Sequence, residues 1–350
     1  MTRTAVNVST AVSLATRTTL RVGGPAAEFV EARTEADAIA AVADADAHGM
    51  PVLILGGGSN VLIGDAGFDG RVVAMAIRGI TDEADMCSGA MVTVAAGENW
   101  DALVARAVNN GWTGIEALSG IPGLVGGTPI QNVGAYGQDV SETIARVRTY
   151  DRLEARLQTF FAADCGFAYR TSRFKTDPGR YLILDVTFQF GLGDLGAPVA
   201  YLELARRLGV ELGERAPLAD VRRAVLEIRA SKGMVLDDAD YDTWSAGSFF
   251  TNPILDGAAA AGLPADASRW RVGDGTVKTS AAWLIEHAGF HRGHGDGPAT
   301  VSTKHTLALT NRGTATADDV VALAREIRDG VRARFGVELV PEPVLVGVEL

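Results

Sequence analysis

The sequence predicts an α+β protein built from more than one domain. Its 350 residues exceed what a single hydrophobic core usually serves. Segments with helical spacing and short runs of branched apolar residues both occur along the chain, in mixed order. Glycine accounts for 41 residues, well above the usual ~7% of a chain, and this indicates many turns and close backbone approaches.

The first clear pair of elements is a helix followed by a strand. Thr34 and Asp37 form a start that resembles a capping box, and apolar residues then recur at helical spacing. Gly49 ends the predicted helix, and Pro51 prevents its continuation. The apolar run 52–55 predicts a short buried strand that leads directly into a glycine-rich loop.

The same two patterns continue towards the C-terminus. Strand-like runs lie near residues 71–77, 91–96, 145–151 and 182–190. Helical spacing and capping residues predict helices over about 100–110, 201–209, 218–231, 280–288 and 316–336. We expect a turn-rich linker at 191–199 and a mixture of short strands and turns over 244–310.

Composition argues against several classes of protein. The formal net charge of −11, with no basic run, argues against a nucleic-acid-binding protein. No apolar stretch approaches the ~20 residues of a membrane span, and no apolar signal segment is visible at the start. Cys87 and Cys165 are far apart and favour plain thiols in a reducing compartment. We therefore expect a cytoplasmic protein that binds neither nucleic acid, membrane nor metal.

The loop Gly56-Gly57-Gly58-Ser59-Asn60 follows the predicted strand at 52–55. Consecutive backbone N–H groups without side chains can curl around a phosphate, but a tight turn explains the same residues equally well. The spacing matches neither the dinucleotide-binding fingerprint of a Rossmann fold nor a Walker loop. A dinucleotide bound here would therefore require a different fold.

A second glycine-rich segment covers residues 114–137. Small residues dominate it, with four polar side chains interleaved, namely Thr128, Gln131, Asn132 and Tyr136. Such a strip lets backbone lie against a flat or extended ligand. Closely packed turns are the structural alternative.

Together, the two segments resemble the FAD-binding half of the flavoenzyme family that includes vanillyl-alcohol oxidase and the UDP-N-acetylenolpyruvoylglucosamine reductases (MurB). Three further elements resemble the reductases in particular. They are Tyr169-Arg170 with the residues up to Lys175, the string Gly-Ser-Phe-Phe-Thr-Asn-Pro at 247–253, and Pro341-Glu342-Pro343. The string at 247–253 is the most specific, and the resemblance runs from about Thr18 to Val346.

The resemblance implies a two-part FAD-binding domain of the vanillyl-alcohol-oxidase type and a C-terminal α+β substrate-binding domain. The implied boundaries are 1–78 and 79–215 for the two FAD-binding parts, 216–336 for the substrate domain, and 337–350 for a C-terminal strand segment carrying Glu342. It further implies a monomer that holds FAD noncovalently. The implied reaction is the NADPH-dependent reduction of UDP-N-acetylglucosamine enolpyruvate to UDP-N-acetylmuramate in peptidoglycan precursor synthesis.

Carried over residue by residue, the resemblance assigns three catalytic positions. Ser248 would donate a proton to the substrate carbanion, and Arg170 would hold the substrate carboxylate as its charge builds. Glu342 would orient Arg170 or the enolate carboxylate. Taken alone, the same residues fit a turn serine, a surface arginine and a solvated glutamate.

Further positions are assigned to the substrate and to FAD. Tyr201, Lys232 and Asn252 would hold the uridine diphosphate, and Tyr201 stands in the insert after residue 190 that marks the class with a lid tyrosine. His287 would contact the substrate, although a surface histidine is an equal alternative. The expected FAD contacts are Gly56, Gly57, Gly58, Ser59, Asn60, Val61, Pro122, Gly123, Gly126, Gly127, Thr128, Asn132, Gly134, Ala135 and Arg229.

Two departures and two rival functions remain open. Val344 stands where many relatives have an arginine that contacts the flavin, and Pro343 replaces a usual valine. One rival is an oxygen-using flavin oxidase of the same fold. Many such oxidases tether FAD through His or Cys, and here both cysteines and the five histidines lie outside the glycine segments. The other rival is a non-catalytic protein that binds a UDP-sugar or a flavin.

Overall fold

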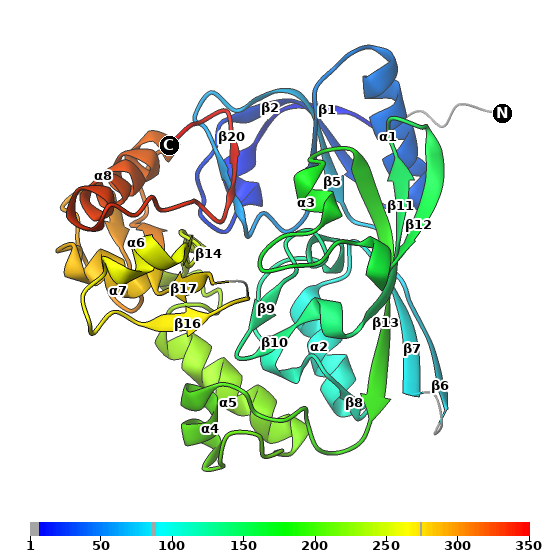
Figure 1. The fold of residues 1–350 in the computed structure, drawn as a ribbon. Helices are drawn as coiled ribbons and strands as arrows, with labels where there is room; N and C mark the ends of the chain where they lie inside the picture. Colours follow the sequence, from blue (N-terminus) through cyan, green and yellow to red (C-terminus); the bar gives the residue numbers. More distant parts are fainter. Residues whose placement is uncertain (1–6, 86–88, 274) are drawn as a thin grey trace. The chain divides into compact units, whose positions relative to one another are not determined.

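The computed structural model describes residues 7–85, 89–273 and 275–350, and these residues form two compact units (Figure 1). The first unit takes in Ala26–Gly57 and Asp69–Ala230, together with the chain up to Val12. The second unit takes in Ser13–Pro25, Gly58–Phe68 and Ser231–Leu350. Each unit is therefore assembled from separate stretches of chain. The domain boundaries expected from the resemblance stay a prediction.

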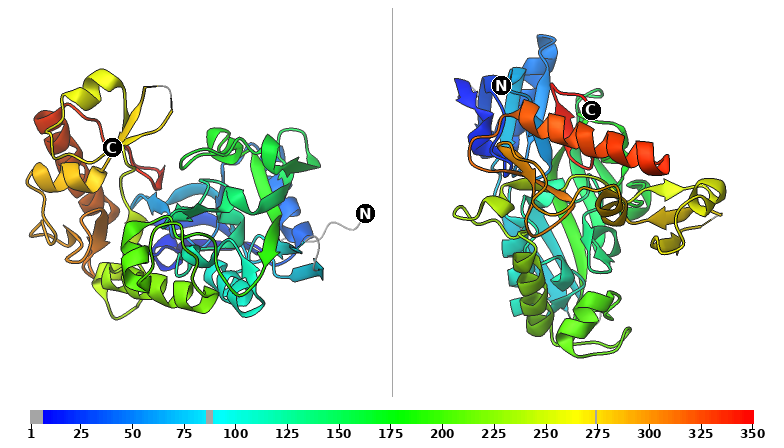
Figure 2. Two further views of the ribbon diagram at one scale, coloured as in Figure 1. Left: turned by 60° about the horizontal axis from the view of Figure 1, so that its bottom comes forward. Right: turned by 90° about the vertical axis from the view of Figure 1, so that its left-hand side faces the viewer.

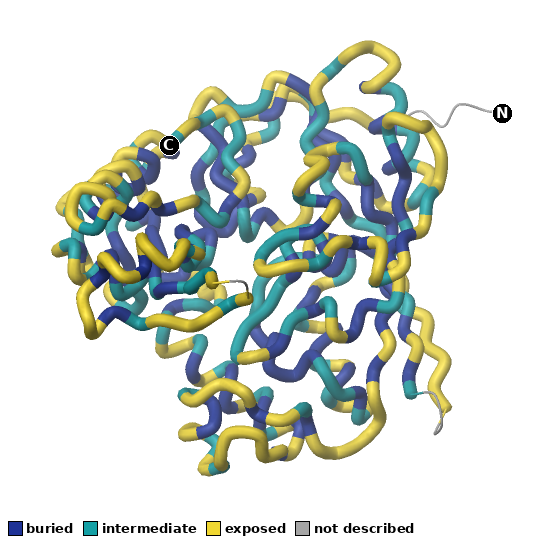
Figure 3. The backbone as a smooth tube through the Cα atoms, in the orientation of Figure 1, coloured by how far each residue is buried: buried dark blue, intermediate teal, exposed yellow. Residues whose placement is uncertain are grey.

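The first unit is centred on an antiparallel sheet in the order β12-β11-β13-β7-β6, with β8 paired to β13. These strands are β6 (Ile80–Asp85), β7 (Gly89–Ala95), β8 (Trp112–Thr113), β11 (Ile144–Asp151), β12 (Arg156–Phe161) and β13 (Tyr181–Leu192). The central strand β13 is mostly buried, whereas the edge strand β6 is mostly exposed (Figure 3).

A second sheet of the first unit has the order β1-β2-β5-β3, with β3 parallel to β5. Its strands are β1 (Ser9–Ser13), β2 (Pro25–Ala32), β3 (Val52–Leu55) and β5 (Phe68–Met75). Both sheets contribute to one hydrophobic core, which also receives α1 (Glu35–Ala47) and α2 (Trp100–Asn109). Thr34 and Asp37 close the capping box of α1, so the predicted start of this helix is confirmed.

Shorter elements complete the first unit. A small separate core joins α4 (Leu202–Leu208) to α5 (Leu218–Ser231). The remaining elements are α3 (Arg173–Thr176), the paired β9 (Gly134–Ala135) and β10 (Gln138–Asp139), and the 3₁₀ helices η2 (Glu116–Leu118), η3 (Val125–Gly127), η4 (Val140–Glu142) and η5 (Ala162–Asp164).

The second unit holds a three-stranded antiparallel sheet in the order β14-β19-β18. The long helix α8 (Ala317–Phe335), orange to red in Figure 2, contacts β18 and β19, and α7 (Ala281–His287) contacts α8. The strands are β14 (Ser245–Ser248), β18 (Ala299–Val301) and β19 (Ala308–Asn311). Phe249, Phe250 and Ile327 lie in the core of this unit.

Two early pieces of chain are built into the second unit. β4 (Val61–Ile63) pairs in parallel with β20 (Val344–Val346), close to the C-terminus. The carboxylate of Asp65 then accepts the N–H groups of Ala317 and Asp318 at 2.9 and 3.0 Å, which caps the start of α8. The remaining elements of this unit are η1 (Leu14–Arg17), η6 (Tyr241–Thr243), α6 (Gly257–Ala261), β15 (Ile254–Leu255), β16 (Arg269–Arg271) and β17 (Val277–Thr279).

The helices and longer strands predicted from the sequence are confirmed in α1, α2, α4, α5, α7 and α8 and in β3, β5, β7, β11 and β13. Cys165 is a buried free thiol whose pKa is raised to about 12 by burial, whereas Cys87 lies outside the described residues. None of the helices in the described ranges combines the length and apolar composition needed to cross a bilayer. Within the same ranges, no cluster of three or more His, Cys, Asp or Glu is arranged to hold a metal.

Candidate functional site

The first unit brings the two glycine-rich segments into contact. Gly57, which follows β3, lies so close to Gly123 that a Cβ on Gly57 would stand 2.8 Å from the Gly123 Cα. Gly126 is equally confined, because its Cβ would stand 2.6 Å from the Cβ of Ala96. The fold itself therefore requires glycine at Gly57 and Gly126.

Gly56 and Gly127 are different, because the fold does not require glycine there. Neither has a positive φ angle, and a Cβ built on either would meet no atom within 4 Å among the described residues. A side chain would fit at both positions, so a ligand lying against the bare backbone gives a physical reason for its absence. The two segments thus fit an extended cofactor such as FAD.

Two predicted cofactor contacts have side chains that the protein itself uses. The buried Thr128 hydroxyl donates to the carbonyl of Val125 at 2.8 Å and closes η3. The buried Asn132 amide donates to Ala168 O at 3.3 Å and accepts from Ser141 N at 3.1 Å. These side chains shape the segment, and their contacts with a cofactor stay a prediction.

Arg170 is tied to the same segment. Its Nη1 donates to the carbonyl of Asn132 at 3.3 Å, and its Nη2 donates to the carbonyl of Gly134 at 2.5 Å. Its backbone is left-handed, with φ 54°, and the ammonium of Lys175 donates to its carbonyl at 3.1 Å. The glycine-rich segment therefore fixes the plane of the guanidinium.

Tyr136, Tyr201 and Arg229 form a further group in the first unit. The rings of Tyr136 and Tyr201 meet edge to face, with centroids 5.4 Å apart, and the Arg229 guanidinium hydrogen-bonds Tyr136. Burial raises the pKa of Tyr136 to about 12, and burial also lowers the pKa of Arg229. Tyr136 is one of the polar residues of the second glycine-rich segment, and its sequence position alone indicated no role for it.

Asp101 fixes the helix that carries Arg229. Arg222 of α5 donates to both carboxylate oxygens of Asp101, at 2.6 and 2.9 Å, and Gly120 N donates to one of them at 2.6 Å. Burial raises the pKa of Asp101, but the hydrogen bonds from Arg222 and Gly120 outweigh it and hold the pKa below its ordinary value. Sequence reasoning missed this carboxylate, because its partner lies in a distant helix.

The second unit brings Ser248, Glu342 and Asn60 together. Ser248 ends β14, and the carbonyl of the next residue, Phe249, accepts the N–H of Glu342 at 2.8 Å. The Asn60 side chain donates to the Glu342 carbonyl at 3.4 Å, and Asn60 O accepts the N–H of Val344 at 3.0 Å. Three segments that are far apart in the sequence thus meet through hydrogen bonds of their backbones and of the Asn60 side chain.

The backbone before Ser248 is irregular. Ser245 and Ser248 pair with Thr310 and Ala308 of β19, with a shift of register between them, and Gly247 has a φ of 75°. Only glycine adopts this conformation readily, so Gly247 allows the strand to turn the half-buried Ser248 away from a regular ladder.

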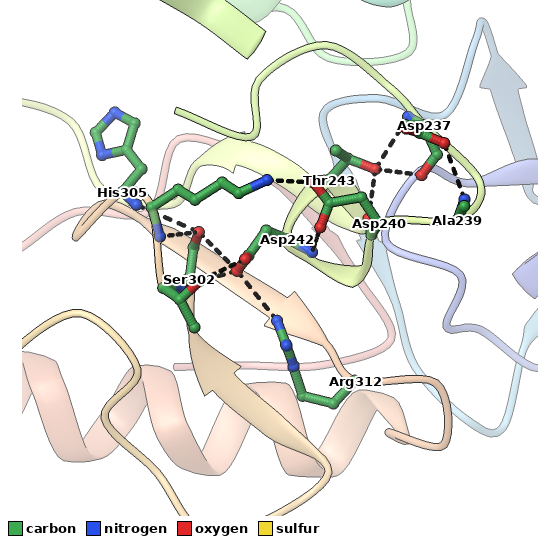
Figure 4. A network of polar contacts seen from close by, with 10 residues as sticks. Asp237, Ala239, Asp240, Asp242, Thr243, Ser302, His305 and Arg312 are labelled. Atoms are coloured by element: carbon green, nitrogen blue, oxygen red, sulfur yellow. Dashed lines mark hydrogen bonds and ion pairs between the residues drawn. The ribbon is translucent and has the colours of Figure 1, made fainter. Parts of the chain in front are cut away.

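A network around Asp242 holds both strands that position Ser248 (Figure 4). The buried Asp242 carboxylate accepts from Ser302 Oγ at 2.9 Å, from Arg312 Nη1 at 3.0 Å, and from the N–H and hydroxyl of Thr303 at 2.8 and 2.5 Å. It therefore joins η6, just before β14, to the turn between β18 and β19. Burial raises the pKa of Asp242, but the hydrogen bonds from Thr303 and Ser302 outweigh it, and the pKa lies below its ordinary value.

The three remaining predicted substrate contacts also lie in the second unit. Lys232 is half-buried and follows α5 directly. Asn252 Oδ1 accepts the N–H of Ala281 at 3.0 Å and so helps to begin α7. His287 is exposed, stacks on Trp283 with ring centroids 3.8 Å apart, and hydrogen-bonds the Trp283 carbonyl at 2.8 Å. These contacts are those of a surface histidine, and a role of His287 in binding stays a prediction.

Two separate parts of the chain match known protein families. Residues 26–154 match the FAD binding domain family, and residues 239–346 match the C-terminal domain of UDP-N-acetylenolpyruvoylglucosamine reductase. A UDP-N-acetylenolpyruvoylglucosamine reductase of Cutibacterium acnes is 57% identical, and the alignment covers 96% of this chain and 89% of that protein. The chain belongs to the UDP-N-acetylenolpyruvoylglucosamine reductases.

Other members of the reductase family support this assignment. A Streptomyces avermitilis protein of the same name is 56% identical over 96% of this chain and 94% of its own length. The crystal structure of the reductase MurB from Thermus caldophilus matches with a TM-score of 0.66 and 25% identity, covering 97% of this chain and 99% of that one. The family resemblance and the fold class predicted from the sequence are thus confirmed.

The exposed Val344, the first of the two departures expected from the resemblance, begins β20 and pairs with Val61 of β4. Its backbone therefore serves the same local structure that holds Asn60 beside Glu342. Pro343 immediately precedes this strand and does not prevent its formation.

If FAD lies on the bare backbone at Gly56 and Gly127, a methyl group at either position should weaken its binding. We expect Gly56→Ala and Gly127→Ala to raise the Kd for FAD by about fivefold or more, corresponding to about 1 kcal/mol. The melting temperature of the FAD-free protein should not change. Titration of FAD into stripped protein measures the Kd, and Gly193→Ala, also in open space, is the matched control. Unchanged FAD affinity in both variants would contradict the hypothesis that FAD lies against the backbone of Gly56 and Gly127.

The Asp242 network should make the second unit sensitive to acid. The folded pKa of Asp242 lies below its ordinary 3.8, so ionised Asp242 stabilises the fold above that pH, and this contribution is lost as pH falls through the folded pKa. We expect Asp242→Asn to lower the free energy of unfolding by about 2 kcal/mol at neutral pH. Thermal unfolding at several pH values should show the difference narrowing below pH 3.8. A difference independent of pH would exclude the charge as its cause.

Proposed function

We propose that this chain reduces UDP-N-acetylglucosamine enolpyruvate to UDP-N-acetylmuramate, a precursor of peptidoglycan, with FAD as cofactor and NADPH as hydride donor. The main structural support comes from the backbone around Ser248 and Glu342. The hydrogen bond from Glu342 N to Phe249 O places the segment of Glu342 beside the end of β14, directly after Ser248. The expected proton donor and the expected carboxylate are thus held by one piece of paired backbone.

When bound, FAD would supply the relay that takes hydride from NADPH and passes it to the substrate. The backbone of Gly56, Gly57, Gly126 and Gly127 would hold it, because these glycines present backbone without side chains. Arg229 would contribute a positive charge beside Tyr136. We propose noncovalent binding, since no histidine or cysteine occurs in the two glycine segments.

Ser248 is proposed as the proton donor. Reduction places hydride on the methylene carbon of the enolpyruvyl group and a proton on the adjacent carbon that bears the carboxylate. A hydroxyl is a weak acid in water, but the carbanion that it meets is a strong base. A donor fixed next to the carbanion also avoids the entropy cost of bringing a proton donor from solvent. The left-handed Gly247 and the two paired strands hold the Ser248 backbone for this purpose.

Arg170 and Glu342 are proposed to act on the charge that builds up during the reaction. As the adjacent carbon becomes carbanion-like, negative charge spreads onto the substrate carboxylate, and a planar guanidinium suits its two oxygens. The carbonyls of Asn132 and Gly134 orient that guanidinium before the substrate arrives. Glu342 would orient Arg170 or the enolate.

Lys232, Tyr201 and Asn252 are proposed to bind the uridine diphosphate. A diphosphate needs local positive charge on a chain whose formal net charge is −11, and the half-buried Lys232 supplies one. We further propose that the protein acts in the cytoplasm as a monomer, without nucleic acid or membrane, in keeping with its acidic net charge of −11 and the absence of a basic run.

The proposed reaction predicts a colour cycle. The purified protein should be yellow, and NADPH should bleach it under anaerobic conditions. The enolpyruvyl UDP-sugar should then restore the colour and be converted to product in equal amount. Absorbance of the flavin, with product analysis, measures each step. Rapid oxygen consumption by the reduced protein with no response to the UDP-sugar would instead support an oxidase of the same fold, and a protein without the bleaching step would be a binding protein only.

Ser248→Ala should separate the two halves of this cycle. Bleaching by NADPH needs no proton from Ser248 and should proceed at a near-normal rate. Recovery of colour with the UDP-sugar should slow by roughly 10²–10⁴-fold, the usual contribution of a positioned proton donor. Ser248→Cys, with a more acidic donor of similar reach, should regain part of the second step. Anaerobic stopped-flow absorbance of the flavin measures both steps. Equal slowing of the two steps would show that Ser248 is not the proton donor.

A further inference from the structure

Glu116 is a buried carboxylate to which no role has been given above. It lies in η2, inside the second glycine-rich segment, and its exposed fraction is 1%. Its Oε2 accepts the N–H of Gly114 at 2.7 Å, and its Oε1 accepts from Gln138 Nε2 at 2.8 Å and from Ala197 N at 2.6 Å. Three N–H donors satisfy the carboxylate, and one of them comes from the insert that follows β13.

The bond to Ala197 reaches the root of that insert. Gly196, beside it, donates its N–H to Ala216 O at 2.9 Å and accepts from Arg215 Nη1 at 2.8 Å. Leu195 and Pro217 form a β-bridge at the same place. The outgoing and returning chains of the insert therefore meet at Gly196, and Glu116 fixes that junction.

Gly196 is pressed against the carboxylate. A Cβ at Gly196 would stand 2.7 Å from Glu116 Oε1 and 3.2 Å from its Cδ and Cγ. The φ of Gly196 is not positive, so this contact, and not backbone strain, is what opposes a side chain there. The carboxylate cannot swing aside without giving up buried hydrogen bonds.

The insert carries Tyr201 at the N-cap of α4, where its ring meets Tyr136 edge to face. Tyr201 is exposed, so few contacts of its own fix its position. Leu204 and Val199 tie the insert to a small core that includes Ala117, the residue next to Glu116. The position of the Tyr201 ring therefore depends on how firmly the root of the insert is held.

We propose that Glu116 is a positioning residue of the reductase: its carboxylate anchors the root of the insert and thereby sets Tyr201 over Tyr136 in the place from which it contacts the substrate. This inference rests on the substrate role proposed above for Tyr201. Glu116 itself touches neither substrate nor cofactor in this scheme.

The test uses two glycines of the same insert. Gly196→Ala places a methyl group against Glu116, whereas Gly193→Ala, with no described atom within 4 Å of its Cβ and no positive φ, is the matched control. We expect Gly196→Ala to raise KM for the UDP-sugar about fivefold or more, the factor for one lost interaction, with FAD content and the rate of bleaching by NADPH unchanged. Gly193→Ala should match the unmodified enzyme in all three.

A double-mutant cycle shows whether the effect passes through the carboxylate. Glu116→Ala removes all three atoms nearest to the new methyl group, so adding Gly196→Ala to it should raise KM no further. An equal KM increase from Gly196→Ala with and without Glu116 would overturn the proposal.

Limited proteolysis measures how firmly the insert is held, independently of enzyme activity. Arg206, Arg207 and Arg215 are exposed trypsin sites within it, and Gly196→Ala should be cut there severalfold faster than Gly193→Ala. Unchanged cleavage together with unchanged KM would overturn the anchoring role. Faster cleavage with unchanged KM would overturn the substrate role of Tyr201 on which the inference rests.

Discussion

The contact between Gly57 and Gly123 is the constraint on which the rest of the first unit depends. Main chain meets main chain there at a separation that no Cβ would allow, so the loop after β3 and the segment before η3 form one surface. The bare backbones of Gly56 and Gly127 and the carbonyls that orient Arg170 belong to the two segments joined by this contact. Loss of this close approach would separate the expected cofactor contacts from each other before any side chain chemistry was affected.

Two buried carboxylates connect segments that backbone hydrogen bonds alone do not join. Asp242 joins η6 to the turn after β18. Glu116 joins a glycine-rich turn to an insert that lies 81 residues further along the chain. Such a group is stable in the interior only when its donors are all in place, so it specifies one arrangement of the chain more strictly than apolar contacts do. Each carboxylate holds the backbone segment of a residue with a proposed role: Asp242 holds that of Ser248, and Glu116 holds that of Tyr201.

Local signals in the sequence predicted local structure well. Thr34 with Asp37 and Thr316 with Asp319 mark helix starts because a capping box involves only residues three apart, and both boxes are present. The string at 247–253 likewise identified the family and the residue types of the candidate site. The bonds from Ser302 to Asp242 and from Ala197 to Glu116 could not be predicted, because these donors lie 60 and 81 positions away along the chain. The same holds for Tyr136, whose neighbours Arg229 and Tyr201 come from helices that fold back onto its segment.

The pairing of β4 with β20 bears on how this chain is made. Residues Gly58–Phe68 are synthesised long before Val344, where the strand that they pair with begins. The first unit can form its own sheets while this short stretch, with its buried Leu62 and Ile63, stays without its partner until β20 has been synthesised. A fragment that begins at Ser231 would lack the strand that pairs with β20, so the second unit cannot be produced from its C-terminal stretch alone.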